Sequence, residues 1–295
     1  MHEETGSPPK PPGTTSLALL TIFVLVPVGY GLWLSTHEFD GITVGAWVGA
    51  DHYLDVLADP AFRRALWHTV VFAALVVVGK NAAGLALALL VNLPLRGMRA
   101  ARTLLFLPVT LNIIVIGAFW TLFLAAARFG GLLNQALEAA GLAALARSWL
   151  GEPGLALLSV ALVEIWRWAG LHMLIFLAGM QAIDPSLYEA ARIDGAGVWR
   201  RFWHVTLPQL RPLLFVSTLL ALMGAFVRSF DVVWVLTRGG FGTDVLVTHL
   251  YNTAFRHGEF DRATAMGFIV LALIAIISLG YARIARSAHP EARDG

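Results

Sequence analysis

The stretch that decides the fold reads Leu66-Trp-His-Thr-Val-Val-Phe-Ala-Ala-Leu-Val-Val-Val-Gly-Lys-Asn-Ala-Ala-Gly-Leu-Ala-Leu-Ala-Leu-Leu-Val91, an apolar block with a single charged residue, Lys80. It exceeds the ~18 residues that mark a candidate transmembrane helix. Strands of a membrane barrel would be short and alternating, and this block does not alternate. Because a segment in lipid must satisfy its own backbone hydrogen bonds, the block is predicted to be a transmembrane helix.

Five further apolar blocks lie along the chain. Together with the first block they predict spans near residues 17–35, 66–91, 104–126, 155–180, 213–236 and 263–284. The expected fold class is therefore all-α: a polytopic membrane protein in which six transmembrane helices form one domain over residues 17–284.

The composition supports this expectation and excludes several classes of protein. Hydrophobic residues make up 58% of the 295 residues and charged residues only 14%, whereas a soluble domain carries about a quarter charged residues. The mean hydropathy is +0.71. A soluble enzyme, a disordered chain and a coiled coil are therefore poor interpretations, and the net charge of +2 does not favour nucleic-acid binding. Zero cysteines exclude a disulfide scaffold, a thiolate metal site and a cysteine nucleophile.

The two ends of the chain are expected to be cytoplasmic tails, over residues 1–16 and 285–295. The first contains a proline-rich stretch with one lysine, Lys10, and lacks the basic region of a cleaved signal peptide, so the first block is expected to be a retained helix. Lys and Arg are more numerous in the segments on the side of the termini than in the opposite loops. The positive-inside rule therefore places both termini inside.

The segment between the fourth and fifth blocks reads Asp184-Pro-Ser-Leu-Tyr-Glu-Ala-Ala-Arg-Ile-Asp-Gly-Ala-Gly-Val-Trp-Arg-Arg-Phe-Trp-His-Val-Thr-Leu-Pro208. Asp184 suits the N-cap of a helix and Pro185 its first position. Gly195 and Gly197 are expected to break that helix, and Pro208 to end a second, amphipathic one. The prediction is two short helices joined by a glycine turn on the cytoplasmic face.

The spacing within this segment carries a resemblance. Glu189-Ala190-Ala191 is followed after three residues by Gly195, and after nine more by Val205-x-Leu207-Pro208. This resembles the EAA loop of permease subunits in binding-protein-dependent ABC importers, with valine where isoleucine is usual. In that family the loop docks into a cleft of the ATP-hydrolysing subunit. The resemblance implies that the ATPase-coupling positions are Glu189, Ala190, Ala191, Asp194, Gly195, Leu207 and Pro208. The alternative is an ordinary capped amphipathic loop.

The resemblance extends over most of the chain and implies the bundle of a type I ABC importer permease. Residues 161–181 look like the helix that precedes the loop in sugar permeases. Residues 229–242 are similar to the exit of the fifth helix in the larger maltose-type permease partner, except that Phe241 stands where that family commonly has proline. A glycerol-3-phosphate-type permease is also similar.

A permease needs no bond-making residue, so polar and aromatic groups within the spans are the candidates for the substrate path. The candidates are Lys80, Asn81, Asn112, Trp120, Glu164, Arg167, Trp168 and Phe226. Ionisable residues in a membrane are costly and suggest function. Glu164 and Arg167 are spaced i, i+3 and could form an intrahelical pair, which either binds substrate hydroxyls or is only self-neutralised.

The other candidates have competing interpretations too. Lys80 and Asn81 suit hydrogen bonding between helices somewhat better than substrate contact. Asn112, close to a proline, could mark a kink that lines the cavity. Arg228 and Asp231 are expected to form an interfacial ion pair. Sugars often stack on aromatic rings, but tryptophan is also enriched at membrane interfaces for other reasons.

Motifs for catalysis are missing from the sequence. The nine histidines show no His-x-x-x-His or His-Glu-x-x-His spacing for a metal, and there is no Gly-x-Ser-x-Gly elbow. There is also no Gly-x-x-x-x-Gly-Lys-Ser/Thr phosphate loop, so the energy for transport would come from a separate subunit. The chain is expected not to be an enzyme, and to bind no metal or cofactor itself.

The resulting hypothesis is a permease subunit of an ABC importer for a mono- or oligosaccharide in the inner membrane of a prokaryote. Its expected partners are a second, homologous permease subunit, two ABC ATPase subunits that bind ATP and Mg²⁺, and an extracytoplasmic solute-binding protein. The outer segments 51–64 and 239–261 would face that binding protein. The alternatives are a permease for glycerol-3-phosphate or another sugar derivative and, in a different class, a multispan membrane transferase.

Overall fold

The computed structural model describes residues 14–287, so most of the two predicted tails, 1–13 and 288–295, lies outside the described residues. The chain divides into two compact units. The first contains residues up to Ala58 together with Leu250–Ile269, and the second contains Asp59–His249 together with the residues from Val270 onward. Helices α14 (Leu246–Phe255) and α15 (Phe260–Ser287) each contribute residues to both units.

The first unit begins with an apolar helical segment and continues into a small hairpin. The helical segment consists of α1 (Thr14–Leu20), a π-helical turn η1 (Thr21–Leu25) and α2 (Val26–Leu34). Strands β1 (His37–Phe39) and β2 (Val44–Trp47) then pair antiparallel, and α3 (Asp51–Ala58) follows. This hairpin lies between the first two predicted spans, and the sequence pattern did not predict it.

The turn of the hairpin is organised by Asp40. One carboxylate oxygen of Asp40 accepts hydrogen bonds from the backbone N–H groups of Ile42, at 2.9 Å, and Thr43, at 2.7 Å. The Thr43 hydroxyl donates to the other oxygen. These bonds lower the pKa of Asp40 to about 2, and the bond from the backbone N–H of Thr43 contributes most. At neutral pH the carboxylate is therefore charged and holds the turn closed.

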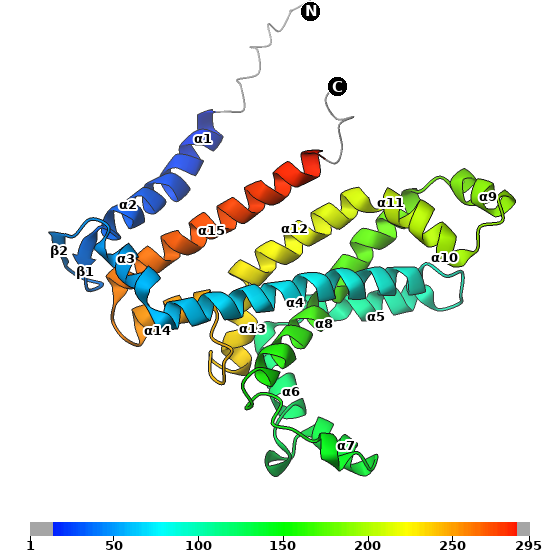
Figure 1. Ribbon diagram of the computed structural model, residues 1–295, viewed down its shortest axis with the longest axis horizontal. Helices are drawn as coiled ribbons and strands as arrows, with labels where there is room; N and C mark the ends of the chain where they lie inside the picture. The colour runs from blue at the N-terminus through cyan, green and yellow to red at the C-terminus, as the bar shows by residue number, and fades with distance from the viewer. Residues whose placement is uncertain (1–13, 288–295) are drawn as a thin grey trace, which may run out of the picture. The chain divides into compact units, whose positions relative to one another are not determined.

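The second unit contains most of the helices. In chain order they are α4 (Pro60–Val91), α5 (Met98–Thr110), α6 (Ile113–Phe123), η2 (Ala127–Phe129), α7 (Leu132–Ala139), η3 (Ala143–Leu145), α8 (Leu155–Ala182), α9 (Pro185–Ile193), α10 (Val198–Arg201), η4 (Phe202–Thr206), α11 (Leu207–Gln209), α12 (Arg211–Val227) and α13 (Ser229–Leu236), before the shared helices α14 and α15. Within this unit α9 and α10 project at one end, and α7 lies at the opposite end (Figure 1).

Helices α4 and α8 pack along much of their length, and glycines on α4 permit the close approach. A side-chain carbon at Gly84 would lie 2.5 Å from Cβ of His172 on α8, and one at Gly79 would collide with Ile165. Helix α4 starts where Asp59 accepts a hydrogen bond from the N–H of Ala61, as expected for an N-cap followed by proline.

The predicted spans are present, but two of them are not continuous. Four helical segments among the described residues are long and apolar enough to cross a membrane: 16–34, 60–91, 155–182 and 260–281. The third predicted span, 104–126, is broken into α5 and α6 with a bend of 98°. The segment 198–209 meets α12 at 68°. Counting each bent pair as one span gives six.

The third span breaks for a local reason. Pro108 lies inside α5, and the chain becomes extended at Leu111 and Asn112. The Asn112 side chain then caps α6 by accepting a hydrogen bond from the N–H of Ile114 at 2.8 Å. The fifth predicted span, 213–236, is likewise interrupted, because α12 ends at Val227 and α13 starts at Ser229.

Two apolar clusters stabilise the second unit. One contains Phe72 and Val76 of α4 together with Val160 of α8, and the other contains Val91 of α4 together with Phe176 of α8. Between these clusters each helix carries a buried ionisable residue, Lys80 on α4 and Glu164 on α8. We call this region the polar layer; its buried members are Lys80, Glu164, His172 and Ser217.

Candidate functional site

The polar layer contains a buried salt bridge between two long helices. Nζ of Lys80 on α4 donates a hydrogen bond to Oε1 of Glu164 on α8 at 2.8 Å, and the side chains are 3% and 1% exposed. The second carboxylate oxygen, Oε2, has no hydrogen-bond partner within the described chain. The predicted pair between Glu164 and Arg167 is not formed, because the buried lysine of the facing helix takes the carboxylate.

Three cationic side chains surround the ring of Trp168. Cζ of Arg228 lies 4.5 Å from the ring centroid, Cζ of Arg167 lies 5.3 Å from it and Nζ of Lys80 lies 5.6 Å from it. These distances suit cation–π attraction. The expected ion pair between Arg228 and Asp231 is absent from the described residues, where the two are joined only by a backbone hydrogen bond at 3.3 Å. Arg228 stacks on the tryptophan of α8 instead.

A chain of hydrogen bonds continues the polar layer toward α12. The Ser217 hydroxyl donates to Oδ1 of Asn81 at 2.7 Å, and Nδ2 of Asn81 donates to Oγ1 of Thr218 at 3.2 Å. Nδ1 of His172 lies 2.6 Å from the Ser217 oxygen. Because the serine proton is already given to Asn81, Nδ1 of His172 must carry the proton in this bond. The helix–helix hydrogen bonding expected for Asn81 is therefore present.

The other substrate-path candidates lie apart from these groups. Asn112 is exposed and serves as the N-cap of α6. Trp120 packs against Phe123 and Trp166, with 5.3 Å between ring centroids in each case, and its indole N–H has no partner among residues 14–287. Phe226 is 5% exposed and belongs to the apolar core.

Sequence reasoning missed several members of the polar layer. His172 follows Glu164 by eight residues, close to two helical turns, so the helical period could have placed both on one face. Ser217 and Thr218 carried no comparable signal, because short hydroxyl side chains are ordinary in membrane helices. Their role becomes visible only when α12 is placed beside α4.

The loop over residues 184–208 has the predicted helix and glycine turn. Asp184 caps α9 by accepting a hydrogen bond from the N–H of Ser186 at 2.9 Å, and that backbone bond is the main cause that lowers the pKa of Asp184. At the other end Gly195 has φ of +71°. The N–H of Gly195 bonds to the carbonyl of Arg192 and that of Ala196 to the carbonyl of Ala191, which is a Schellman motif.

The second half of the loop differs from the prediction at Pro208. The proline does not end the helix, because it lies in α11 and the break falls at Leu210. A π-helical turn, η4, precedes it, and the N–H of Leu207 bonds five residues back to the carbonyl of Phe202. The α-helical hydrogen-bond pattern is therefore already interrupted before Pro208. Because proline has no N–H to donate, Pro208 at this position removes no hydrogen bond from a regular α-helix.

The two short helices are joined to each other and present an exposed surface. The Tyr188 hydroxyl on α9 lies 2.9 Å from Oγ1 of Thr206 in η4. Glu189 and Ala190 are exposed, Ala191 is half-buried and Asp194 is the exposed C-cap of α9. The surface also carries large apolar side chains, namely Ile193, Val198, Trp199 and Trp203, which are 86%, 74%, 75% and 56% exposed. Exposed apolar patches of this kind are typical of surfaces that contact another protein or a membrane.

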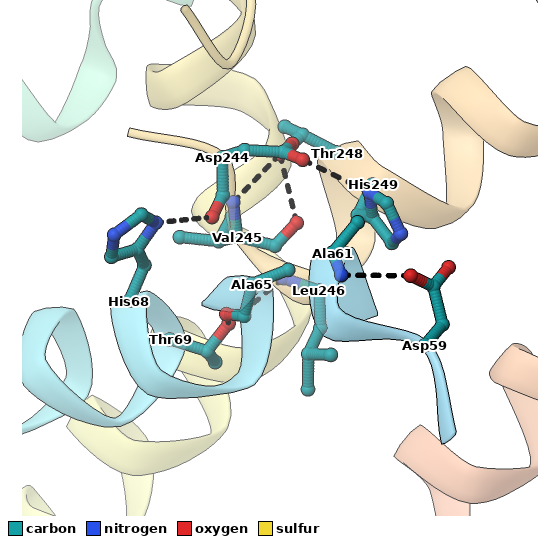
Figure 2. A network of polar contacts seen from close by, with 10 residues as sticks. All are labelled: Asp59, Ala61, Ala65, His68, Thr69, Asp244, Val245, Leu246, Thr248 and His249. Carbon is teal, nitrogen blue, oxygen red and sulfur yellow. Dashed lines mark hydrogen bonds and ion pairs between the residues drawn. The ribbon is translucent and has the colours of Figure 1, made fainter. Parts of the chain in front are cut away.

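A second polar network lies near the start of α4, and Figure 2 shows its members. Thr69 on α4 accepts a hydrogen bond from the N–H of Leu246 at 2.8 Å, and Nδ1 of His68 donates to the carbonyl of Asp244 at 3.1 Å. The Asp244 carboxylate in turn binds Thr248 at 2.7 Å. This network fastens the segment after α13 to α4, and no sequence motif pointed to it.

Comparison with known proteins gives one family. Residues 80–290 match the family described as "Binding-protein-dependent transport system inner membrane component". The chain is 35% identical over 263 residues to the probable ABC transporter permease protein YurN of Bacillus subtilis (strain 168), covering 88% of this chain and 89% of that one. It is 32% identical over 269 residues to the lactose transport system permease protein LacF of Rhizobium radiobacter, covering 89% of each chain.

A solved structure is similar over the same extent. A bacterial ABC transporter involved in the import of the acidic polysaccharide alginate contains a chain that matches with a TM-score of 0.80 and 25% identity, covering 93% of each chain. These relatives are permeases and not enzymes, so the alternative of a membrane transferase is not supported.

Proposed function

The chain belongs to the family of binding-protein-dependent transport system inner membrane components, and from this premise we propose that it is the sugar-translocating permease subunit of an ABC importer. It is a multi-pass inner membrane protein. The observation that carries the proposal is the cytoplasmic loop, in which a capped helix, a left-handed glycine and a second short helix stand exposed at one end of the second unit (Figure 1).

The shape of this loop suits transmission of force to an ATPase subunit. Ala190 is exposed and Ala191 half-buried on α9, so a partner can approach the backbone closely. The break at Leu210 connects the loop directly to α12, which supplies Ser217 and Thr218 to the polar layer. A displacement of the loop would thus be transmitted along one helix to the groups proposed to line the path.

The proposed substrate class rests on the relatives and on the polar layer. The lactose permease among the relatives is named for a sugar. The polar layer offers amide, hydroxyl, imidazole and indole groups next to aromatic rings, a combination that suits the hydroxyl groups and apolar faces of a saccharide. Asn81, Arg167 and Trp168 are the partly exposed residues proposed to line the path, and the buried pair of Lys80 and Glu164 supports them.

The remaining parts of the transporter follow from the family. A solute-binding protein would deliver the sugar on the outer side, and two ATPase subunits would bind ATP and Mg²⁺ and hold the loop. A second, homologous permease would complete the path. The proposed orientation places both termini and the loop in the cytoplasm, in agreement with the distribution of Lys and Arg. Closure of the ATPases would then drive alternating access.

Substitutions in the glycine turn test this proposal with a matched control. Gly195 and Gly197 both have open space around a built side-chain carbon, but only Gly195 has positive φ. In the reconstituted transporter Gly195→Asp should abolish sugar uptake and substrate-stimulated ATP hydrolysis, and Gly195→Ala should weaken them. Gly197→Ala, whose backbone is extended, should leave both near the wild-type level.

A charge reversal gives a second, independent test. Glu189→Lys inverts an exposed charge on α9, and Glu138→Lys makes the same change on α7 at the opposite end of the unit. Only the first should lower uptake and ATPase stimulation. If Gly195→Asp and Glu189→Lys assemble with the ATPases and transport sugar normally, the loop is not the coupling element.

A further inference from the structure

Three cationic side chains and only one carboxylate lie around Trp168, and from this we infer that the substrate is an anionic saccharide, one that carries a carboxylate or phosphate group. The inference rests on the proposed function and narrows its substrate class. The groups concerned are Lys80, Arg167 and Arg228 around Trp168, with Glu164 as the carboxylate; we call them the cationic cluster.

Two of the three cations approach one point on α12. A side-chain carbon built at Gly224 would lie 3.7 Å from Nζ of Lys80 and also 3.7 Å from a terminal guanidinium nitrogen of Arg228. Arg167 reaches the same ring of Trp168 from α8. The three cations therefore gather from α4, α8 and the end of α12 around one indole and one glycine.

The acids available to this cluster do not balance it. Glu164 forms its ion pair with Lys80, and no ion pair in the described part of the chain involves Arg167 or Arg228. Nε of Arg167 is buried and lacks a hydrogen-bond partner there. Like charges held this close repel each other, most strongly where one of them is buried, as Lys80 is. Two guanidinium groups beside an ammonium are therefore an unfavourable arrangement until an anion joins them.

The accessible members of the cluster are the two arginines. Lys80 and Glu164 are closed off, whereas Arg167 is half-buried and Arg228 is exposed. A guanidinium presents a planar fork of N–H donors that binds carboxylate or phosphate through two parallel hydrogen bonds. A neutral sugar offers only hydroxyl groups and would leave both positive charges uncompensated. The Lys80–Glu164 pair would hold α4 and α8 together beside the arginines, and the arginines themselves would contact the anion.

The wild-type transporter gives the first test, because it needs no substitution. It would be assembled with its binding protein in proteoliposomes and supplied with matched saccharides: glucose, glucuronate and glucose 6-phosphate, then α-1,4-linked galactotriose and trigalacturonate. Uptake and ATPase stimulation should be greater for an acidic member of a set than for its neutral counterpart. The glucuronate and glucose 6-phosphate arms separate a carboxylate from a phosphate ligand.

Substitutions in the cluster give the second test. Arg228→Gln and Arg167→Gln should each raise the half-saturating concentration of the acidic saccharide roughly tenfold or more, because a charge-assisted bidentate contact is lost. Arg228→Lys keeps the charge but lacks the planar fork of donors, so its half-saturating concentration should lie between those of the wild type and Arg228→Gln. Arg99→Gln removes an equal charge from an exposed position on α5 and should have no such effect.

The possible results separate the inference from the proposed function. Preference for the neutral saccharides, or equal use of both kinds, would overturn the inference and leave the importer intact. So would weaker permease assembly in Arg228→Gln with unchanged selectivity in the fraction that still assembles, since that result would indicate an acidic partner subunit as the counter-ion. If no saccharide stimulates ATP hydrolysis or enters the vesicles, the proposed function itself fails.

Discussion

Nζ of Lys80 and Oε1 of Glu164 are 2.8 Å apart, although 84 residues separate them in the chain, and this bond joins the long helices α4 and α8 between their two apolar clusters. Both side chains are almost entirely buried. The desolvation cost of a buried ion pair can match its attraction, so the pair need not stabilise the protein overall. Its geometric consequence is specific, because it sets the register of α4 against α8.

Replacing one residue of this pair should destabilise the protein far more than replacing both residues. Lys80→Met leaves a buried, unpaired carboxylate and should destabilise the protein by about 3–5 kcal/mol. The double variant Lys80→Met/Glu164→Gln should recover most of that loss. Thermal unfolding of the purified permease complex, analysed as a double-mutant cycle, measures the coupling. Additive effects of the two single changes would contradict the paired arrangement.

Much of the fold could be predicted from the sequence, because the apolar blocks are long and the spacing around Glu189 and Gly195 is specific. The pairing of Lys80 with Glu164 could not be. The sequence places Arg167 three residues from Glu164, and a local pair is then the simplest expectation. Helical periodicity indicates which face a residue occupies, but it does not indicate which helix lies opposite that face.

The breaks in the helices were also hard to predict. An asparagine within an apolar block can be a buried polar group or an N-cap, and composition alone does not separate the two. At Asn112 the chain turns by 98°, and the side chain satisfies a backbone N–H of α6. Its position near Pro108 hinted at the kink, whereas its role as a cap required the structure.

In the hydrogen-bond chain through Ser217, a substitution should cost more stability when it leaves more buried groups without a hydrogen-bond partner. Ser217→Ala leaves Nδ1–H of His172 and Oδ1 of Asn81 without their partner, which should cost about 1–3 kcal/mol. Thr218→Val removes only one longer bond to Asn81, at 3.2 Å, and should cost less. Thermal unfolding of the complex compares the two, and an equal or reversed order would argue against the chain.

The bond between Thr69 and Leu246 should control local opening of the segment after α13. Thr69→Val retains the shape of the side chain but leaves a buried backbone N–H unpaired (Figure 2). The amide of Leu246 should then exchange with solvent roughly tenfold faster or more. Thr264→Val, which removes a hydroxyl bonded within its own helix, is the control and should leave that amide unchanged. Unaltered exchange in Thr69→Val would refute this role.

The cap of α9 should depend on pH in a defined direction. Hydrogen bonds to the carboxylate, the one from the backbone N–H of Ser186 above all, lower the pKa of Asp184 in the folded loop below its ordinary value. A depressed folded pKa contributes stability that is present above the unfolded pKa and is lost as the pH falls through the folded pKa. The protection factor of the Ser186 amide should therefore fall below about pH 4. Asp184→Asn keeps an acceptor without titrating, so its protection should stay flat across this range.

The contact between Tyr188 and Thr206 should keep the two halves of the loop over residues 184–208 moving as one body. Tyr188→Phe removes the 2.9 Å bond without changing the ring, and a neutral hydrogen bond contributes about 0.5–1.5 kcal/mol. The loop would still dock on the ATPases through α9, but its displacement would reach α12 less completely. We therefore expect ATP hydrolysis to persist while the sugar moved per ATP falls several-fold. Tyr30→Phe, at an exposed position in α2, makes the same chemical change and should alter neither quantity. A parallel fall in hydrolysis and uptake in Tyr188→Phe would instead indicate that the hydroxyl serves docking, and unchanged values for both would show that the two helices need no link.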